Sequence, residues 1–155
     1  MGVELEKVLK KFITTSLLVC AFNSMAYSHL PNQTLTPGEY ASSSLSEICA
    51  SGYPERARNV SETTKRRVYA MYGVRTAECR GGCKIDHLLP LSIGGSNEIA
   101  NLWPHEYDQF WSVYKKTRLE VRLRREVCAQ RMPLDEARTC IASDWTACYN
   151  RFYRN

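Results

Sequence analysis

Three residues whose types could do chemistry stand in the stretch KIDHLLPLSIGGSNEIANLWP, residues 84–104. Asp86 and His87 are adjacent, and Asn101 follows fourteen residues after His87. A carboxylate can hold a divalent ion that stabilises charge on a phosphate, and an imidazole can take a proton from an attacking water. An amide can hold the imidazole or its strand in position. The set therefore predicts metal-assisted hydrolysis of a phosphodiester.

The same residues also have ordinary structural interpretations. His87 could be a packed strand histidine, Asp86 a turn or salt-bridge acid, and Asn101 a capping or Asx-turn residue. If a metal is bound, one carboxylate with other oxygen ligands and waters suits Mg²⁺, whereas imidazole ligands favour Mn²⁺, Ni²⁺ or Zn²⁺. A zinc site at Cys79 and Cys83 is not expected, because no second close pair of ligands accompanies them.

A β-hairpin would bring these residues together. Alternation along a strand places Ile85, His87 and Leu89 on one side and Asp86 on the other. Pro90 ends this strand or confines it to an edge, and the Gly-Gly-Ser-Asn sequence that follows is typical of a turn. A short return strand at NLWP, residues 101–104, would then bring Asn101 back beside His87.

Helical patterns lie on both sides of the predicted hairpin. Residues 61–73 predict a helix with Ser61 as N-cap and Gly73 at the C′ position. A longer helix is predicted from about residue 107 to residue 130, crossing the hairpin. The residues expected on its buried faces are Phe110, Val113, Thr117, Leu119, Leu123 and Val127.

Two shorter helices follow, at residues 133–143 and 144–153, the second capped by Asp144 and burying Trp145. The order of helix, hairpin, long helix and short helices predicts an α+β fold. In this fold a small hairpin and its crossing helix are embedded in mostly helical surroundings.

The combination of Asp-His, Gly-Gly-Ser-Asn and Asn-Leu-Trp-Pro at this spacing resembles the HNH endonucleases, the ββα-metal family. RNVSETTKRRVYAMYG before it and KTRLEVRLRREVCAQRMPLDEARTCIASDW after it are similar to an exported bacterial and phage branch of that family. The resemblance covers residues 48–153. It implies Asp86 as a metal ligand, His87 as the general base and Asn101 as the residue that orients it.

The resemblance also implies a third metal position on the crossing helix, where relatives carry a histidine in a W-x-x-His-x-K segment. This chain has Tyr114 at that position, and a neutral phenol is a poor ligand for Mg²⁺. His105, Glu106 or Asp108 could substitute for it. The alternative is a catalytically impaired protein of the same fold that binds nucleic acid or is structural. A third alternative is a small secreted disulfide domain that resembles the family by chance.

The positive charge of the chain is mild and compatible with a polyanionic partner, without establishing one. The chain carries a formal net charge of +5, and removal of residues 1–26, with three lysines and two glutamates, leaves +4. The predicted long helix has a basic stripe that would contact phosphates without reading sequence, or would be a solvated face with local glutamate pairs. The expected partner is nucleic acid, DNA rather than RNA, bound by a monomer. The residues of the stripe are Lys115, Arg118, Arg122 and Arg125.

The chain begins like an exported protein. Residues 1–26 predict a signal peptide with a lysine-containing start, a short apolar stretch and a small-x-small cleavage pattern. Residues 27–47 predict a flexible or loosely docked lead-in, and residues 48–155 the domain. The predicted location is the periplasm or the outside of the cell, with no membrane attachment of the mature form.

Six cysteines remain after residue 26, and in an exported chain an even set predicts disulfides, although the sequence does not choose among the pairings. Cys79 and Cys83 flank a flexible loop that could close on itself. Cys140 and Cys148 would lie about 12 Å apart on one straight helix, so either a break separates them or each pairs elsewhere. The two remaining cysteines, Cys49 and Cys128, are then plausible long-range partners.

Overall fold

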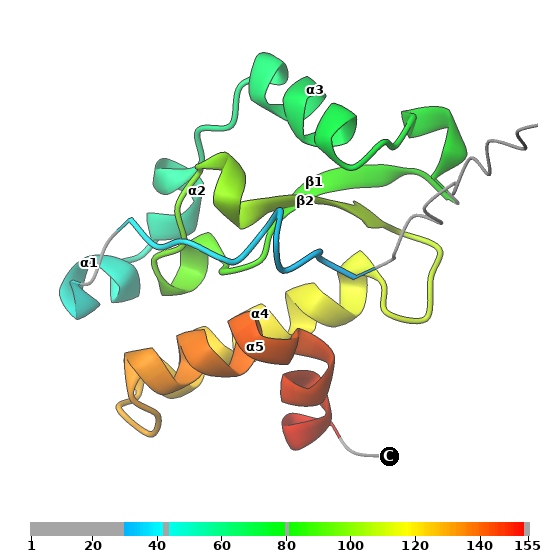
Figure 1. Cartoon of the computed structure of the whole chain (residues 1–155). Coiled ribbons are helices and arrows are strands. Elements are labelled where there is room, and N and C mark those ends of the chain that lie inside the picture. Colours follow the sequence, from blue (N-terminus) through cyan, green and yellow to red (C-terminus); the bar gives the residue numbers. More distant parts are fainter. Residues whose placement is uncertain (1–29, 42–43, 80, 154–155) are drawn as a thin grey trace, which may run out of the picture.

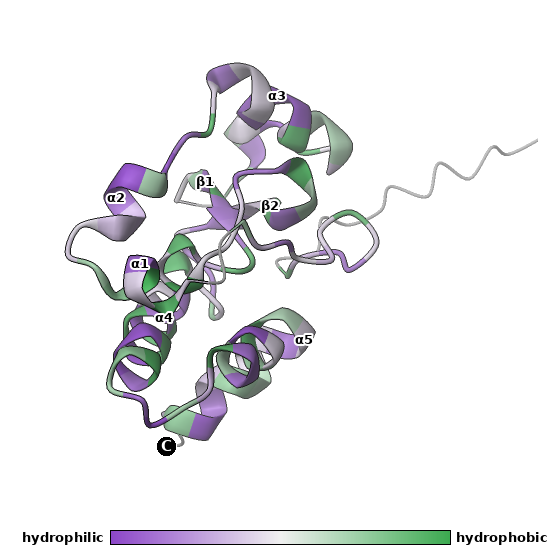
Figure 2. Ribbon diagram, turned by 90° about the vertical axis from the view of Figure 1, so that its left-hand side faces the viewer, coloured by the Kyte–Doolittle hydropathy of each residue, from purple (hydrophilic) through white to green (hydrophobic). Residues whose placement is uncertain are grey.

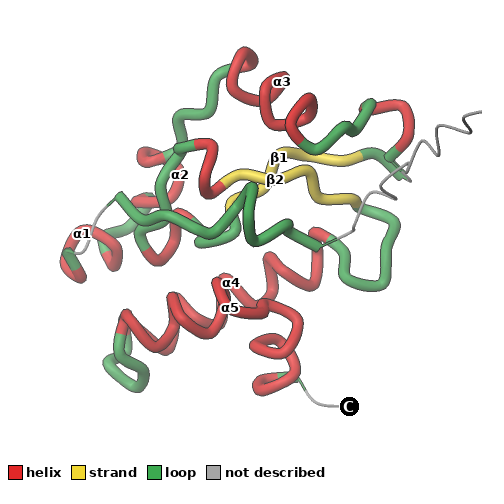
Figure 3. The backbone as a smooth tube through the Cα atoms, in the orientation of Figure 1, coloured by secondary structure: helices red, strands yellow, loops and turns green. Residues whose placement is uncertain are grey.

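A computed structural model of the chain describes residues 30–41, 44–79 and 81–153, and these residues form the predicted α+β fold (Figures 1 and 3). The predicted signal peptide, residues 1–26, lies outside the described residues. The α-helices are α1 (Leu45–Cys49), α2 (Tyr53–Ala57), α3 (Glu62–Met71), α4 (Val113–Cys128) and α5 (Leu134–Phe152). The short 3-10 helices are η1 (Thr76–Glu78), η2 (Leu91–Ile93) and η3 (Ile99–Asn101). The strands are β1 (Cys83–His87) and β2 (Leu102–Glu106).

The predicted β-hairpin is present. Strands β1 and β2 pair antiparallel, with Asp86 opposite Trp103 and His87 opposite Leu102. β1 ends at His87, two residues before the predicted limit, because the backbone of Leu89 bonds to a side chain instead of to a strand. The amide of Asn101 accepts from the Leu89 N–H at 2.8 Å and donates to the Leu89 carbonyl at 2.9 Å.

Helices cover the hairpin on both sides. α3 lies over one face, and α4 and α5 lie under the other, so the strands form the middle layer (Figures 1 and 3). The predicted helix at residues 61–73 is confirmed as α3, where the Ser61 hydroxyl accepts from the Thr64 N–H at 3.0 Å. Gly73 follows the helix in the left-handed conformation, with φ of 63°.

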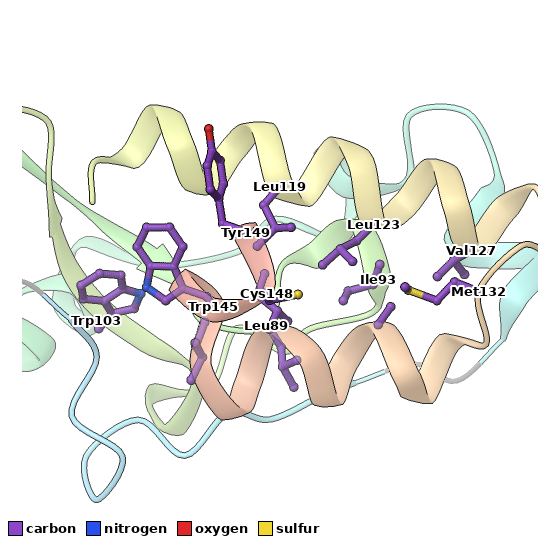
Figure 4. Close-up of a cluster of buried hydrophobic side chains, with 13 residues drawn as sticks. Leu89, Ile93, Trp103, Leu119, Leu123, Val127, Met132, Trp145, Cys148 and Tyr149 are labelled. Carbon is purple, nitrogen blue, oxygen red and sulfur yellow. The ribbon is translucent and has the colours of Figure 1, made fainter. Parts of the chain in front are cut away.

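The largest group of buried apolar side chains lies between α4, α5 and η2 (Figure 4). Leu119, Leu123 and Val127 of α4 are buried as predicted. Hydrophobic and hydrophilic residues alternate along α4 and α5 (Figure 2), which is the pattern of helices with one buried face. The other members of this group include Leu89, Ile93, Trp103, Met132, Ile141, Trp145 and Tyr149.

The predicted start of the long helix at residue 107 is wrong, because α4 begins at Val113. Residues 107–112 form a loop in which Phe110 is 73% exposed, and Thr117 is exposed on the helix itself. The ring of His105 bonds to the carbonyl oxygen of Trp111 at 2.9 Å. This contact holds the loop against β2. It also occupies the Trp111 carbonyl, which would accept a backbone hydrogen bond if the helix began at residue 107.

Helix α5 contains the predicted break. Asp144 has extended backbone angles, φ −162° and ψ 97°. Its carboxylate accepts from the backbone N–H groups of Thr146 and Ala147 at 2.9 and 3.1 Å, so it caps the second half of the helix as predicted. The break brings the α-carbons of Cys140 and Cys148 to 5.3 Å, and these two cysteines form a disulfide.

Two further disulfides are present in the described residues. Cys49–Cys128 ties α1 to the end of α4, and Cys79–Cys83 closes the loop before β1. Three disulfides are compatible with an oxidising compartment. None of the described helices is long and apolar enough to cross a membrane.

The described part of the lead-in lies against the domain. The Thr36 hydroxyl is buried and donates to the Leu102 carbonyl at 2.9 Å. The Ala41 N–H donates to the Gly94 carbonyl at 2.9 Å, and Tyr40 forms a β-bridge with Gly95. Residues 30–41 therefore support the loop that joins the two strands.

Candidate functional site

His87 is buried at the end of β1, on the face of the hairpin that α3 covers. Its Nε2 lies 3.1 Å from Oδ1 of Asn97, and only 3% of the residue is exposed. The Asn97 amide is oriented by its other bonds, since Nδ2 donates to the Ala57 carbonyl at 2.8 Å and Oδ1 accepts from the Asn59 N–H at 3.2 Å. Asn97 Oδ1 is therefore an acceptor, and His87 Nε2 is the donor.

This assignment leaves Nδ1 of His87 as the lone-pair nitrogen of the ring. Nδ1 has no hydrogen-bond partner among the described residues. Burial lowers the pKa of His87 to about 4, against the opposing effects of the Asn97 hydrogen bond and the Asp86 charge. The ring is therefore neutral at pH 7 and can accept a proton at Nδ1.

His87 lies on the wall of a cleft between α3 and β1, with a volume of about 530 Å³. Four cationic side chains line this His87 cleft, of which Lys65 pairs with Glu62 at 2.6 Å and Lys84 pairs with Asp86 at 3.1 Å. The excess of positive charge suits an anionic occupant such as a phosphodiester. The four cations are Arg58, Lys65, Arg66 and Lys84.

Asp86 points to the opposite face of the hairpin, as strand alternation predicts. Its Oδ2 accepts from Nδ1 of His105 at 2.9 Å and lies 3.6 Å from the Lys116 ammonium, while Oδ1 pairs with Lys84 at 3.1 Å. Burial opposes ionisation, but Lys116, the His105 hydrogen bond and Lys84 together hold the pKa of Asp86 well below its usual value. Asp86 is a buried counter-ion in this arrangement.

Lys116 is the residue that the sequence interpretation missed. Its side chain is fully buried, and its ammonium donates to the His87 carbonyl and to the Glu120 carboxylate, both at 2.5 Å. Burial opposes its charge, but Asp86 and Glu120 raise the pKa of Lys116 above its ordinary value. The signal in the sequence was the Lys116–Glu120 pair, four residues apart on one helix.

The residues expected to hold a divalent metal do not leave an open position for one. Asp86 and His105 are engaged with each other, and the second nitrogen of His105 bonds to the Trp111 carbonyl. Tyr114 is 69% exposed, and its ring lies 5.8 Å from that of Tyr107 rather than beside Asp86. Within the described ranges no three histidine, cysteine or acidic side chains are grouped as a metal site requires.

Asn101 contacts the backbone rather than the imidazole. Its fully buried amide bonds to both backbone groups of Leu89 and donates to the Ser96 carbonyl at 2.8 Å. Gly95 lies so close that an added Cβ would come within 1.8 Å of the Leu89 carbonyl oxygen. Asn101 therefore holds the loop that follows His87 in place. Asn97, the last residue of the Gly-Gly-Ser-Asn sequence, holds the imidazole ring of His87.

The basic stripe on α4 divides into two pairs. Arg122 pairs with Glu126 at 2.7 Å and Arg125 lies 3.9 Å from the same carboxylate, as in the alternative of local glutamate pairs. Lys115 and Arg118 have no carboxylate partner among the described residues and lie over the rings of Phe110 and Tyr153. The stripe is thus not one uniform phosphate-contacting face.

Comparisons of the chain with known protein families, with curated proteins and with solved structures found no match.

Proposed function

We propose that this protein is an exported endonuclease that hydrolyses phosphodiester bonds in nucleic acid, DNA in the first place, with little sequence preference. The observation that carries the proposal is the place of His87 on the wall of a cationic cleft, where burial lowers its pKa to about 4 and where Nδ1 has no hydrogen-bond partner in the described part of the chain. The resemblance of residues 84–104 to the HNH family and the hairpin followed by the crossing helix α4 support it. The three disulfides support export.

The cleft would bind the phosphate through its cations, and His87 would activate water. In this mechanism Nδ1 takes a proton from the water as the water oxygen bonds to phosphorus. The bond from phosphorus to the leaving oxygen breaks, and that oxygen keeps the electron pair and takes a proton from solvent water. Nε2 keeps its bond to Asn97, which holds the ring in one orientation and favours the imidazolium that forms. Lys116 holds the backbone at the His87 carbonyl.

The divalent ion that the family resemblance implies has no open ligand set at Asp86 and His105. Asp86 and His105 do not fit the role of open ligands, because each is committed to partners within the fold. Mg²⁺ dependence remains a prediction of the resemblance, and it is tested together with the activity.

Nicking of supercoiled plasmid DNA by the purified, disulfide-bonded protein tests the proposal, with Mg²⁺ and with EDTA as separate arms. We expect wild type to nick DNA and His87→Ala to lose that activity. A matched pair on α3 tests the cleft. Arg66→Ala removes a lining cation, whereas Arg67→Ala removes the same charge from an exposed neighbour outside the lining.

Arg66→Ala should slow nicking, and Arg67→Ala should leave it unchanged. Folded wild-type protein that cleaves neither plasmid DNA nor RNA in either arm would overturn the proposal. Cleavage by His87→Ala at the wild-type rate would overturn the assignment of the base.

A second candidate function is nucleic-acid binding without turnover, on the same scaffold. The observation in its favour is that Lys116, and not an open ligand set, stands beside Asp86. This candidate predicts DNA binding that depends on Arg66 and no nicking in any arm. Efficient cleavage by wild type would eliminate it.

A further inference from the structure

A second concave surface lies on the other side of the hairpin, between the start of α4 and the end of α5, with a volume of about 380 Å³. We call it the aromatic groove. Its lining combines several aromatic rings with two cations and contains no carboxylate. The residues that carry the argument are Phe110, Trp111, Lys115, Arg118, Tyr149 and Tyr153.

The rings of the aromatic groove form a continuous row. Phe110 and Trp111 meet edge to face with 5.0 Å between ring centroids, and Trp111 and Tyr149 meet edge to face at 5.9 Å. The rings of Tyr149 and Tyr153 are tilted against each other by 40° at 4.7 Å. Tyr149 is buried at the base of the row, whereas Phe110 is 73% exposed at its end. A large apolar ring held out on a loop contributes little to the core, and its surface is open to a ligand.

Each of the two cations lies over one of these rings. The Lys115 ammonium is 3.4 Å from the centroid of Phe110, and the Arg118 guanidinium is 3.9 Å from that of Tyr153. In contrast to Arg122 and Arg125, neither forms an ion pair with a carboxylate in the part of the chain that the structure describes. The groove therefore places aromatic rings and cations without a carboxylate partner among the described residues at the same place.

We propose that the aromatic groove binds single-stranded nucleic acid, with bases stacked on its rings and phosphates paired with Lys115 and Arg118. Unstacked bases offer both faces to aromatic side chains, whereas the bases of a duplex are already stacked on one another. The choice of nucleic acid as the anion rests on the function proposed above. The binding itself is separate from the His87 cleft and needs no cleavage.

The test is fluorescence anisotropy with a labelled oligodeoxythymidylate and a labelled duplex of equal length, in the His87→Ala background so that the probes stay intact. Phe110→Ala removes the exposed ring. Tyr114→Ala is the matched control, because Tyr114 is also an exposed aromatic residue, at 69%, but lies outside the lining of the groove. Thermal unfolding of each variant confirms that it is folded.

Phe110→Ala should weaken binding of the single strand by about 5- to 150-fold, the range expected for loss of one stacked base. Tyr114→Ala should change it by less than about twofold on the same scale. Binding of the duplex should be nearly unaffected by either change. Inorganic polyphosphate, an anion without bases, should lose affinity with Lys115→Ala but not with Phe110→Ala.

Equal binding of the single strand by the Phe110→Ala and Tyr114→Ala proteins would overturn the proposal, even if wild type nicks plasmid DNA. Equal loss of polyphosphate and single-strand binding in Phe110→Ala would also overturn it, because bases would then play no part. If wild type cleaves nothing while Phe110→Ala alone weakens single-strand binding, the groove stands and the nuclease proposal fails.

Discussion

Acidification from pH 7 to pH 4 should cost about 3 kcal/mol of unfolding free energy through His87 alone. In the folded protein burial lowers the pKa of His87 from 6.5 to about 4. Between these two values the unfolded chain binds a proton at His87 and the folded chain does not, so protons favour unfolding. The stability that His87 contributes is complete above pH 6.5 and is lost as the pH falls towards 4.

The measurement is urea unfolding followed by circular dichroism at a series of pH values, for wild type and His87→Gln. Carboxylates also titrate in this range, so the informative quantity is the difference in unfolding free energy between wild type and His87→Gln. It should change by about 3 kcal/mol between pH 7 and pH 4, because one pKa unit corresponds to about 1.4 kcal/mol. Arg67→Gln, an exposed charge change on α3, is the control and should follow wild type. Parallel curves for wild type and His87→Gln would refute the assignment of a buried, neutral imidazole.

The remaining predictions concern the other face of the hairpin and the disulfides. Lys116→Met should lower the free energy of unfolding by about 3 to 5 kcal/mol in urea, because it leaves the buried Asp86 carboxylate without its main cation. Replacing Cys49 and Cys128 by serine should lower the free energy of unfolding by about 4 to 5 kcal/mol in the same assay, because this disulfide spans 79 residues. Replacing both cysteines of the disulfide within α5 should lower it by about 2 to 3 kcal/mol, because that disulfide spans 8 residues. Tyr114→His should not increase the affinity for Mn²⁺ or Ni²⁺ in calorimetric titrations, because its ring is exposed and turned toward Tyr107; a new tight site would show that residue 114 reaches the metal position.

Patterns local in the sequence predicted most of the elements. The alternation around His87 and the Gly-Gly turn predicted the hairpin, and the cap at Asp144 predicted the helix boundary at which α5 breaks. The spacing of Cys140 and Cys148 left open whether they pair with each other, and this break allows them to do so. The start of α4 could not be predicted in this way. It depends on a bond from His105 in β2 to the Trp111 carbonyl, a contact between two segments that periodicity along one segment does not contain.

The site was less predictable than the fold because its polar partners come from different elements. Periodicity predicts that a lysine among charged residues is on the surface, yet Lys116 is buried. Burial of its charge is tolerable only because Asp86, on β1, and Glu120, one turn along α4, lie within ion-pair distance. Likewise, both Asn97 and Asn101 lie near His87 in sequence, and only the bonds of the folded loop show that Asn97 holds the ring.

Asp86 and His87 are adjacent on β1, and the sequence predicted one shared site for them, but they lie on opposite faces of the hairpin. Asp86 faces α4, where Lys116 and His105 make it part of the buried framework, and His87 faces the cleft under α3. Lys116 connects the two faces, because its ammonium lies near the Asp86 carboxylate and also donates to the His87 carbonyl. Loss of activity in an Asp86 variant would therefore not identify Asp86 as a metal ligand, since the same change would release the backbone that positions the base.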